Sequence, residues 1–133
     1  MSERDENERL LRVGVAAYNR GDFEGMVALF DPEIELRVDS GLGNPGTWYG
    51  RDGFREMVSG WRDAFAEDTS EIVDVSMPDD NHLIAEMRQT AVGSISGVPV
   101  EMTNFYLYEM RDERVVRFHI YGDRETALAA VRK

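Results

Sequence analysis

The chain of 133 residues is 42% hydrophobic and 31% charged, which is typical of one globular domain, and its lack of cysteine excludes disulfide bonds, thiolate nucleophiles and cysteine-ligated metal centres. Asp and Glu number 26 against 15 Lys and Arg, and the net charge of −11 repels phosphate groups, so we expect binding of neither nucleic acid nor an anionic membrane. A charged N-terminus and the lack of a membrane-length apolar run predict a single soluble domain over residues 1–133, located in the cytoplasm.

Three helices and one strand are expected in the first half of the chain. Apolar residues recur at helical spacing in three segments, and polar and apolar residues alternate strictly in one short segment. A Gly- and Pro-rich stretch before the third helix predicts a loop. In chain order these are a helix over 3–19, a short helix capped by Asp22 and ended by Pro32, a strand over 33–38, a loop over 39–50 and a helix over 51–65.

The second half of the chain predicts one strand after another, closed by a short helix. The strands cover residues 71–77, 83–92, 98–110 and 115–121, and Asp123 is a candidate N-cap for the terminal helix. Consecutive antiparallel strands need one covered face, and the helices at the start of the chain supply that cover. We therefore expect an α+β fold in which a curved antiparallel sheet packs on N-terminal helices.

Three stretches carry a resemblance to a known family. They are the run from Tyr18-Asn19-Arg20-Gly21-Asp22-Phe23 to Leu29-Phe30-Asp31-Pro32-Glu33, the segment Tyr49-Gly50-Arg51-Asp52-Gly53-Phe54, and the run from Asn104-Phe105-Tyr106 to Tyr121-Gly122-Asp123. In this order the chain resembles the nuclear transport factor 2-like superfamily, on the branch of SnoaL-like polyketide cyclases and ketosteroid isomerases. The resemblance implies a cone-shaped, cystatin-like roll that encloses a pocket. Because that superfamily includes enzymes and non-catalytic binding domains, the fold alone does not assign a function.

Side-chain alternation indicates which residues face the expected pocket. In the long strand the even-numbered residues form a mostly apolar face that includes Asn104 and Tyr106, and Gln89 interrupts the matching face of the preceding strand. Two amides on a concave apolar face would orient a carbonyl or hydroxyl of a ligand, although two buried amides could also bond to each other or to the backbone. Aromatic side chains could supply the walls, with Trp48 of the expected loop at the mouth of the pocket. The predicted ligand-binding residues are Tyr18, Trp48, Gln89, Tyr106, Phe118 and Ile120. Aromatic residues at such spacing can equally be core.

The resemblance also implies candidate catalytic groups. Asn104 falls near the position where ketosteroid isomerases carry an acidic oxyanion-hole donor, and Asp39 lies one residue beyond the isomerase base position. Regular alternation points Asp39 away from the core, unless a bulge turns it inward. SnoaL-like cyclases use an aspartate near the end of the last strand, where Asp123 is the nearest candidate; its alternative role is to cap the terminal helix. His119 falls on the face opposite the pocket, at the surface or at a dimer interface.

The sequence therefore supports a SnoaL-like protein for a small, largely apolar, oxygenated molecule, with no cofactor and no metal. If it is an enzyme, proton transfer in an isomerase or cyclase fits best; the alternatives are a non-catalytic ligand-binding domain and a dimerisation domain with a filled core. Phe105, Leu107 and Tyr121 predict a homodimer through the outer sheet face, although charged neighbours could leave that face solvated. The G-x-G-x-x-G run over residues 41–46 lacks the helix of a nucleotide site and is interpreted as a loop that could cover the pocket.

Overall fold

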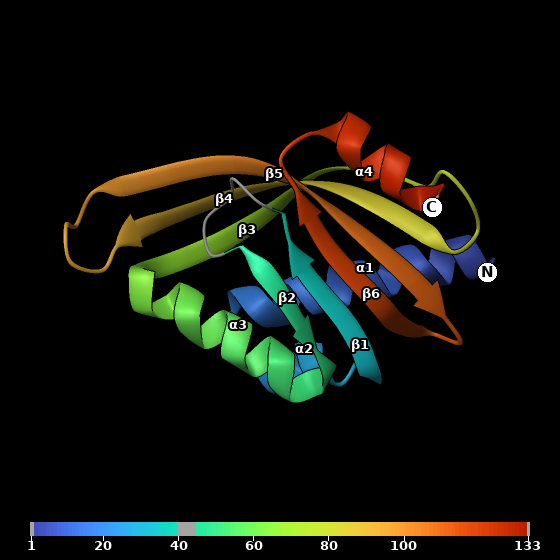
Figure 1. Cartoon of the computed structure of the whole chain (residues 1–133), viewed down its shortest axis with the longest axis horizontal. Helices are drawn as coiled ribbons and strands as arrows, with labels where there is room; N and C mark the ends of the chain where they lie inside the picture. The colour runs from blue at the N-terminus through green and yellow to red at the C-terminus, as the bar shows by residue number, and fades with distance from the viewer. Residues whose placement is uncertain (1, 40–44, 133) are drawn as a thin grey trace.

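The computed structural model describes residues 2–39 and 45–132, in which four helices and one six-stranded sheet form (Figure 1). In chain order the elements are α1 (Glu3–Asn19), α2 (Phe23–Val27), β1 (Phe30–Val38), β2 (Gly46–Tyr49), α3 (Gly50–Ala64), β3 (Phe65–Ser76), β4 (His82–Gly93), β5 (Pro99–Arg111), β6 (Arg114–Tyr121) and α4 (Arg124–Val131). None of the helices in these described residues combines the length and the apolar character needed to cross a bilayer.

The sheet is curved and unclosed, with the strand order β2-β1-β6-β5-β4-β3 (Figure 1). Neighbouring strands are antiparallel except for β1 and β6, which run parallel and bring Leu36 beside Phe118. This pair joins the two ends of the chain, and no local pattern reveals the direction of such a distant pairing. The α+β class with a curved sheet and N-terminal helices is confirmed.

Helices α1, α2 and α3 provide the cover that the concave face of the sheet needs. Helix α1 packs near β3, and α3 packs against β1 and β2. Buried apolar side chains of the helices, such as Leu11 and Phe54, join side chains of the sheet, such as Leu36 and Phe118, in one core cluster. This core lies between the helices and the sheet. Any volume there that side chains do not occupy is therefore a cavity at the concave face of the sheet.

Helix α4 packs on the outer face of the sheet (Figure 1). Leu107 and Tyr121, two residues that predicted a dimer surface, are buried in a second cluster with Ala127 of α4. Phe105 packs against the same cluster and lies under the Arg124 guanidinium, 5.2 Å from the ring centroid. Helix α4 of the same chain thus covers much of the apolar surface through which the homodimer was predicted to form. The homodimer stays a prediction.

Two segments differ from the sequence-based expectation. Residues 46–49, expected in a loop, form the edge strand β2, whose Trp48 pairs with Leu36 of β1. Strand β3 begins at Phe65 and not near residue 71, because the polar segment before residue 71 pairs with the end of β4. Of the G-x-G-x-x-G run, residues 41–44 lie outside the described residues, so its interpretation as a pocket cover stays a prediction.

Candidate functional site

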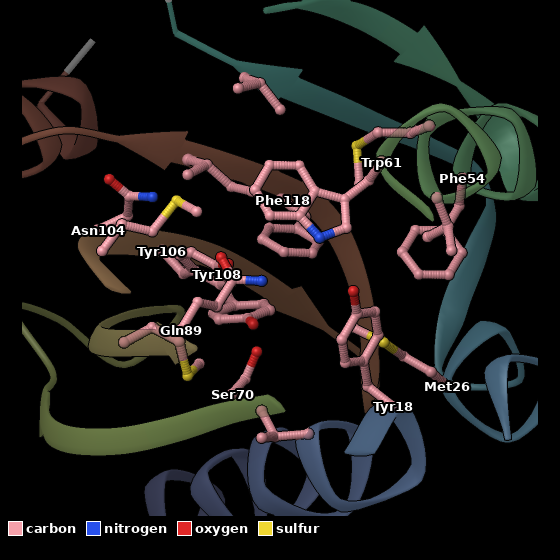
Figure 2. A pocket seen from close by; sticks show the side chains of 17 residues that line it. Tyr18, Met26, Phe54, Trp61, Ser70, Gln89, Asn104, Tyr106, Tyr108 and Phe118 are labelled. Atoms are coloured by element: carbon pink, nitrogen blue, oxygen red, sulfur yellow. The ribbon is translucent and has the colours of Figure 1, made fainter. Parts of the chain in front are cut away.

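A cavity of about 80 Å³ lies between the concave face of the sheet and the helices (Figure 2). By the same measure one water molecule needs roughly 10–15 Å³, so the cavity has room for several waters or a small organic molecule. Its wall is mostly methionine, aromatic and aliphatic side chains. The lining residues are Val15, Tyr18, Met26, Val38, Phe54, Met57, Val58, Trp61, Ser70, Met87, Gln89, Met102, Asn104, Tyr106, Tyr108, Phe118 and Ile120.

Most of the predicted ligand-binding residues lie in this wall. Residues Tyr18, Gln89, Tyr106, Phe118 and Ile120 all line the cavity, and the candidate catalytic residue Asn104 lines it as well. Trp48 is not among the lining residues of the described chain. It lies on β2 and packs so closely against Gly53 of α3 that a side chain at position 53 would contact it. The alternation along β5 and β6 therefore selected the inward side chains, while their contact with a ligand stays a prediction.

The two carboxylates predicted as bases lie elsewhere. The Asp39 backbone N–H donates to the Ile120 carbonyl oxygen over 3.0 Å, and its carboxylate lies 3.6 Å from the Arg37 guanidinium. Asp123 caps α4, its Oδ1 accepting from the backbone N–H of Thr126 over 2.8 Å, and this hydrogen bond lowers the pKa of Asp123. Neither aspartate lines the cavity within the described chain, so their roles as bases stay predictions without a cavity contact.

A third carboxylate, Asp68, is hydrogen-bonded to the cavity wall and was not singled out from the sequence. Its Oδ2 accepts from the Tyr18 hydroxyl and, over 2.8 Å, from Trp61 Nε1. Its Oδ1 accepts from Gln89 Nε2 over 3.2 Å, and Gln89 Oε1 in turn accepts from the Tyr106 hydroxyl over 2.9 Å. The chain of hydrogen bonds thus connects one charged group to four side chains that line the cavity.

A β-bulge accounts for the position of Asp68. In the β3–β4 register Ala66 pairs with Val92 and Thr69 with Thr90, so two residues of β3 stand against one residue of β4. Glu67, the first of the two, has φ +52°, a left-handed conformation that costs a non-glycine residue roughly 1–3 kcal/mol. Bulges often re-aim a side chain next to a functional site. The strand predicted from the sequence began at residue 71, so alternation along it did not extend to Asp68.

The phenols of the cavity wall are neutral hydrogen-bond donors. Burial raises the pKa of Tyr106 and Tyr108, and burial together with the adjacent Asp68 carboxylate raises the pKa of Tyr18. The Tyr108 hydroxyl is buried without a hydrogen-bond partner, and the Asn104 amide also makes no hydrogen bond within the described residues. One carboxylate and several neutral donors around an apolar space can accept a proton and stabilise a developing oxyanion.

His119 lies on the outer face, as the alternation predicts. Its Nε2 is 2.8 Å from Glu35 Oε2, and its Nδ1 is 3.1 Å from the Tyr121 hydroxyl. Burial lowers the pKa of His119, and the guanidinium groups of Arg117 and Arg37 lower it further, against the opposing effect of Glu35. Protonation of this ring is therefore easier in the unfolded chain than in the folded one.

A pH dependence of stability follows for His119. Because its pKa is lowered on folding, the unfolded state binds the extra proton first, and stability falls as the pH drops below the unfolded value of about 6.5. Urea unfolding at pH 7.5 and pH 5.5 measures this loss, and we expect His119→Gln to lose less stability between the two pH values than the wild type. An equal loss of stability in the wild type and in His119→Gln would show that His119 does not cause this pH dependence.

Comparisons with known proteins place the chain in a family. The family model of the SnoaL-like domain matches residues 12–118, whereas no curated protein matches the chain. An NTF2-like protein of unknown function from Burkholderia pseudomallei K96243 is 18% identical, with a TM-score of 0.82 over 99% of this chain and 97% of that one. TerC, co-crystallized with polyporic acid, is 16% identical, with a TM-score of 0.80 over 96% of this chain and 99% of that one.

A candidate polyketide cyclase from Xanthomonas campestris pv. campestris is 19% identical, with a TM-score of 0.80 over 98% of this chain and 99% of that one. At such identities the solved structures share the fold, and they carry no further conclusion about activity. The family match, by contrast, covers most of the sequence: it runs from the second half of α1 to the middle of β6 and includes α2, α3 and the bulged strand β3. The chain belongs to the SnoaL-like domain family.

Proposed function

We propose that this protein binds a small, largely apolar, oxygen-bearing molecule in the cavity and transfers a proton on it without a cofactor, as an isomerase or cyclase does. The observation that carries the proposal is the Asp68 carboxylate, hydrogen-bonded to three side chains of a wall whose described residues are otherwise uncharged. A carboxylate beside an apolar space is suited to take a proton from a carbon next to a carbonyl group. A candidate polyketide cyclase is among the proteins that share this fold.

Proton transfer assigns a role to each polar group. Asp68 takes the proton, and the C–H electron pair moves into the substrate, so that the carbonyl oxygen becomes an enolate oxygen. The Asn104 amide or a tyrosine hydroxyl of the wall donates a hydrogen bond to that oxygen, and the proton returns at another carbon to complete an isomerisation. A carboxylate offers about four lone-pair positions. Tyr18, Trp61 and Gln89 occupy three of them, which leaves one for the substrate proton.

The ligand class follows from the wall and from the charge of the chain. Aromatic rings and methionine side chains favour an apolar body, and the net charge of −11 disfavours the approach of an anion. A neutral ketone, phenol or enol meets both conditions. Asp39 and Asp123 remain the alternative bases. Like Asp68 they are not among the cavity-lining residues, but unlike Asp68 their carboxylates contact Arg37 and Thr126 and not side chains of the wall.

A non-catalytic binding protein is the second candidate function. Every hydrogen bond that Asp68 makes within the described chain is to a protein side chain, and Asp68 itself is not among the residues that line the cavity. The carboxylate could therefore serve only to fix Tyr18, Trp61 and Gln89 in place. Under this alternative the cavity binds the same class of molecule and releases it unchanged.

Two measurements on one set of compounds test the proposal. Neutral ketones and phenols, with polyporic acid added as the compound co-crystallized with TerC, are screened by thermal shift, since a ligand of the folded state raises Tm. Ketones that raise Tm are then incubated with the protein in D2O, and NMR follows loss of the C–H signal beside the carbonyl. We expect faster exchange with the wild type than with Asp68→Asn. Binding without exchange favours the second candidate, and the lack of any stabilising compound contradicts both.

A further inference from the structure

We propose that the Tyr108 hydroxyl donates a hydrogen bond to an accepting oxygen of the bound molecule, and that the Asn104 amide binds a second oxygen of the same molecule. The inference rests on the proposed small-molecule function and specifies its ligand class: a compact apolar body with two separated oxygen groups. The group at Tyr108 is a carbonyl or ether oxygen, because a hydroxyl donor needs an acceptor. Either a hydroxyl or a carbonyl suits the amide at Asn104.

The first observation is the unpaired state of the Tyr108 hydroxyl. Tyr108 is 3% exposed, lines the cavity and has no hydrogen-bond partner for its oxygen among residues 2–39 and 45–132. Most buried side-chain polar atoms in folded proteins are paired, and one left unpaired destabilises the fold. Because Tyr108 also lines the cavity, an oxygen of a molecule bound there is the acceptor that we infer for this donor.

The ring of Tyr108 is held in place. It stacks on Phe118 with ring centroids 4.7 Å apart and an interplanar angle of 22°. Tyr106, two residues earlier on the same face of β5, lies 6.4 Å from it between centroids, and its hydroxyl donates to Gln89. The two phenols thus have different roles: Tyr106 completes the network of Asp68, whereas the Tyr108 hydroxyl remains available to a ligand.

Burial also fixes the chemical state of this group. It raises the pKa of Tyr108 well above its ordinary value, so the phenol keeps its proton at neutral pH. A phenol that keeps its proton donates to a ligand oxygen and does not repel an enolate or a phenolate. Because the phenol stays protonated, Tyr108 contributes a hydrogen bond to ligand binding and does not act as a base.

The second attachment point is Asn104. Asn104 is partly exposed, and its amide makes no hydrogen bond to any described residue. Asn104 and Tyr108 are four residues apart on one face of β5, so their Cα atoms are separated by roughly 14 Å along the strand. Figure 2 shows Asn104 at one side of the cavity and Tyr108 towards its middle. A ligand joining the two would extend from the partly exposed Asn104 to the buried Tyr108.

Matched ligands and matched variants test the inference. The probes are 4-hydroxyacetophenone, acetophenone, 4-ethylphenol and ethylbenzene, which differ in the two oxygen groups and little in shape. Tyr108→Phe should weaken the binding of acetophenone about tenfold and leave ethylbenzene unchanged, because one hydrogen bond to the carbonyl is lost. Asn104→Leu should remove the preference of the protein for 4-hydroxyacetophenone over acetophenone. Affinities are measured by calorimetry.

A second measurement needs no ligand. Tyr108→Phe removes an unpaired buried hydroxyl, so the free variant should unfold at the same Tm as the wild type or higher, whereas the control Tyr106→Phe breaks a hydrogen bond and should unfold at a lower Tm. A Tm loss in Tyr108→Phe equal to that of Tyr106→Phe would overturn the inference. If the probes bind and Tyr108→Phe does not change their affinities, the inference about Tyr108 is overturned and the proposed function is not. If none of the four probes binds the wild type, both the inference and the proposed function are overturned.

Discussion

The Asp68→Ala variant is expected to lose roughly 3 kcal/mol of folding free energy, and Asp68→Asn to lose less stability but all of the proton-transfer activity. Alanine leaves the donors of Tyr18, Trp61 and Gln89 without their acceptor. A buried donor left unpaired costs about 1–3 kcal/mol, and partial exposure of Tyr18 and Trp61 lets water offset part of that cost. Asparagine keeps one acceptor oxygen of the same shape, but its amide does not take up a proton as a carboxylate does.

Urea unfolding measures the stability of both variants, and hydrogen–deuterium exchange of a bound ketone measures proton transfer. Asp39→Asn and Asp123→Asn are the matched controls, because each removes one negative charge at a position predicted as a base from the sequence. Both controls should keep the exchange rate of the wild type, and asparagine at position 123 should still cap α4. Exchange that persists in Asp68→Asn and disappears in either control would transfer the role of base to that control residue.

Alternation along the strands predicted which side chains face the cavity. Asn104 and Phe118 line it, while His119, one residue away from Phe118, lies on the outer face beside Glu35. This prediction succeeds because side chains on a strand alternate with a fixed period of two, and the apolar face of β5 is continuous enough to identify the buried side. The helices that cover this face were predicted for a similar reason, from the 3.6-residue period of their apolar residues.

Asp68 shows why the charged part of the site was not predicted. It stands in a polar segment next to Glu67, which in isolation is typical of a turn. Its inward position depends on a bulge against β4 and on three donors from α1, α3 and β4, all of them long-range features. A single sequence contains the local period of each strand but not the register between strands, so this group of contacts could be seen only in the folded chain.

The outer face illustrates a second limit of the same kind. Leu107 and Tyr121 were correctly identified as apolar side chains of the outer face, and from the sequence a partner chain was the expected cover. In the structure, Ala127 of the C-terminal helix α4 packs there. Whether an apolar strip is buried by its own chain or by a second copy depends on the path of the connection after β6, which hydrophobic patterning does not encode.

Phe118→Ala should be among the most destabilising single substitutions, with a loss of about 3–5 kcal/mol. Phe118 is 3% exposed, stacks on Tyr108 and lies within 6.4 Å of the Phe30 ring between centroids. Its strand β6 also forms the parallel pair with β1, so the vacated space lies at the junction of the two halves of the sheet. Since small domains are stable by only about 5–15 kcal/mol, urea unfolding should reveal a variant close to its stability limit.

The space left by the Phe118 ring would adjoin the existing cavity, and apolar cavities of this kind bind small aromatic molecules. Benzene should therefore raise the Tm of Phe118→Ala by more than it raises the Tm of the wild type, while Phe118→Leu, which fills most of the space, should behave between the two. A variant that keeps wild-type stability, or that gains nothing from benzene, would mean that Phe118 is not a shared wall of core and cavity. In that case the stacked position of Tyr108 against it would also lose its support.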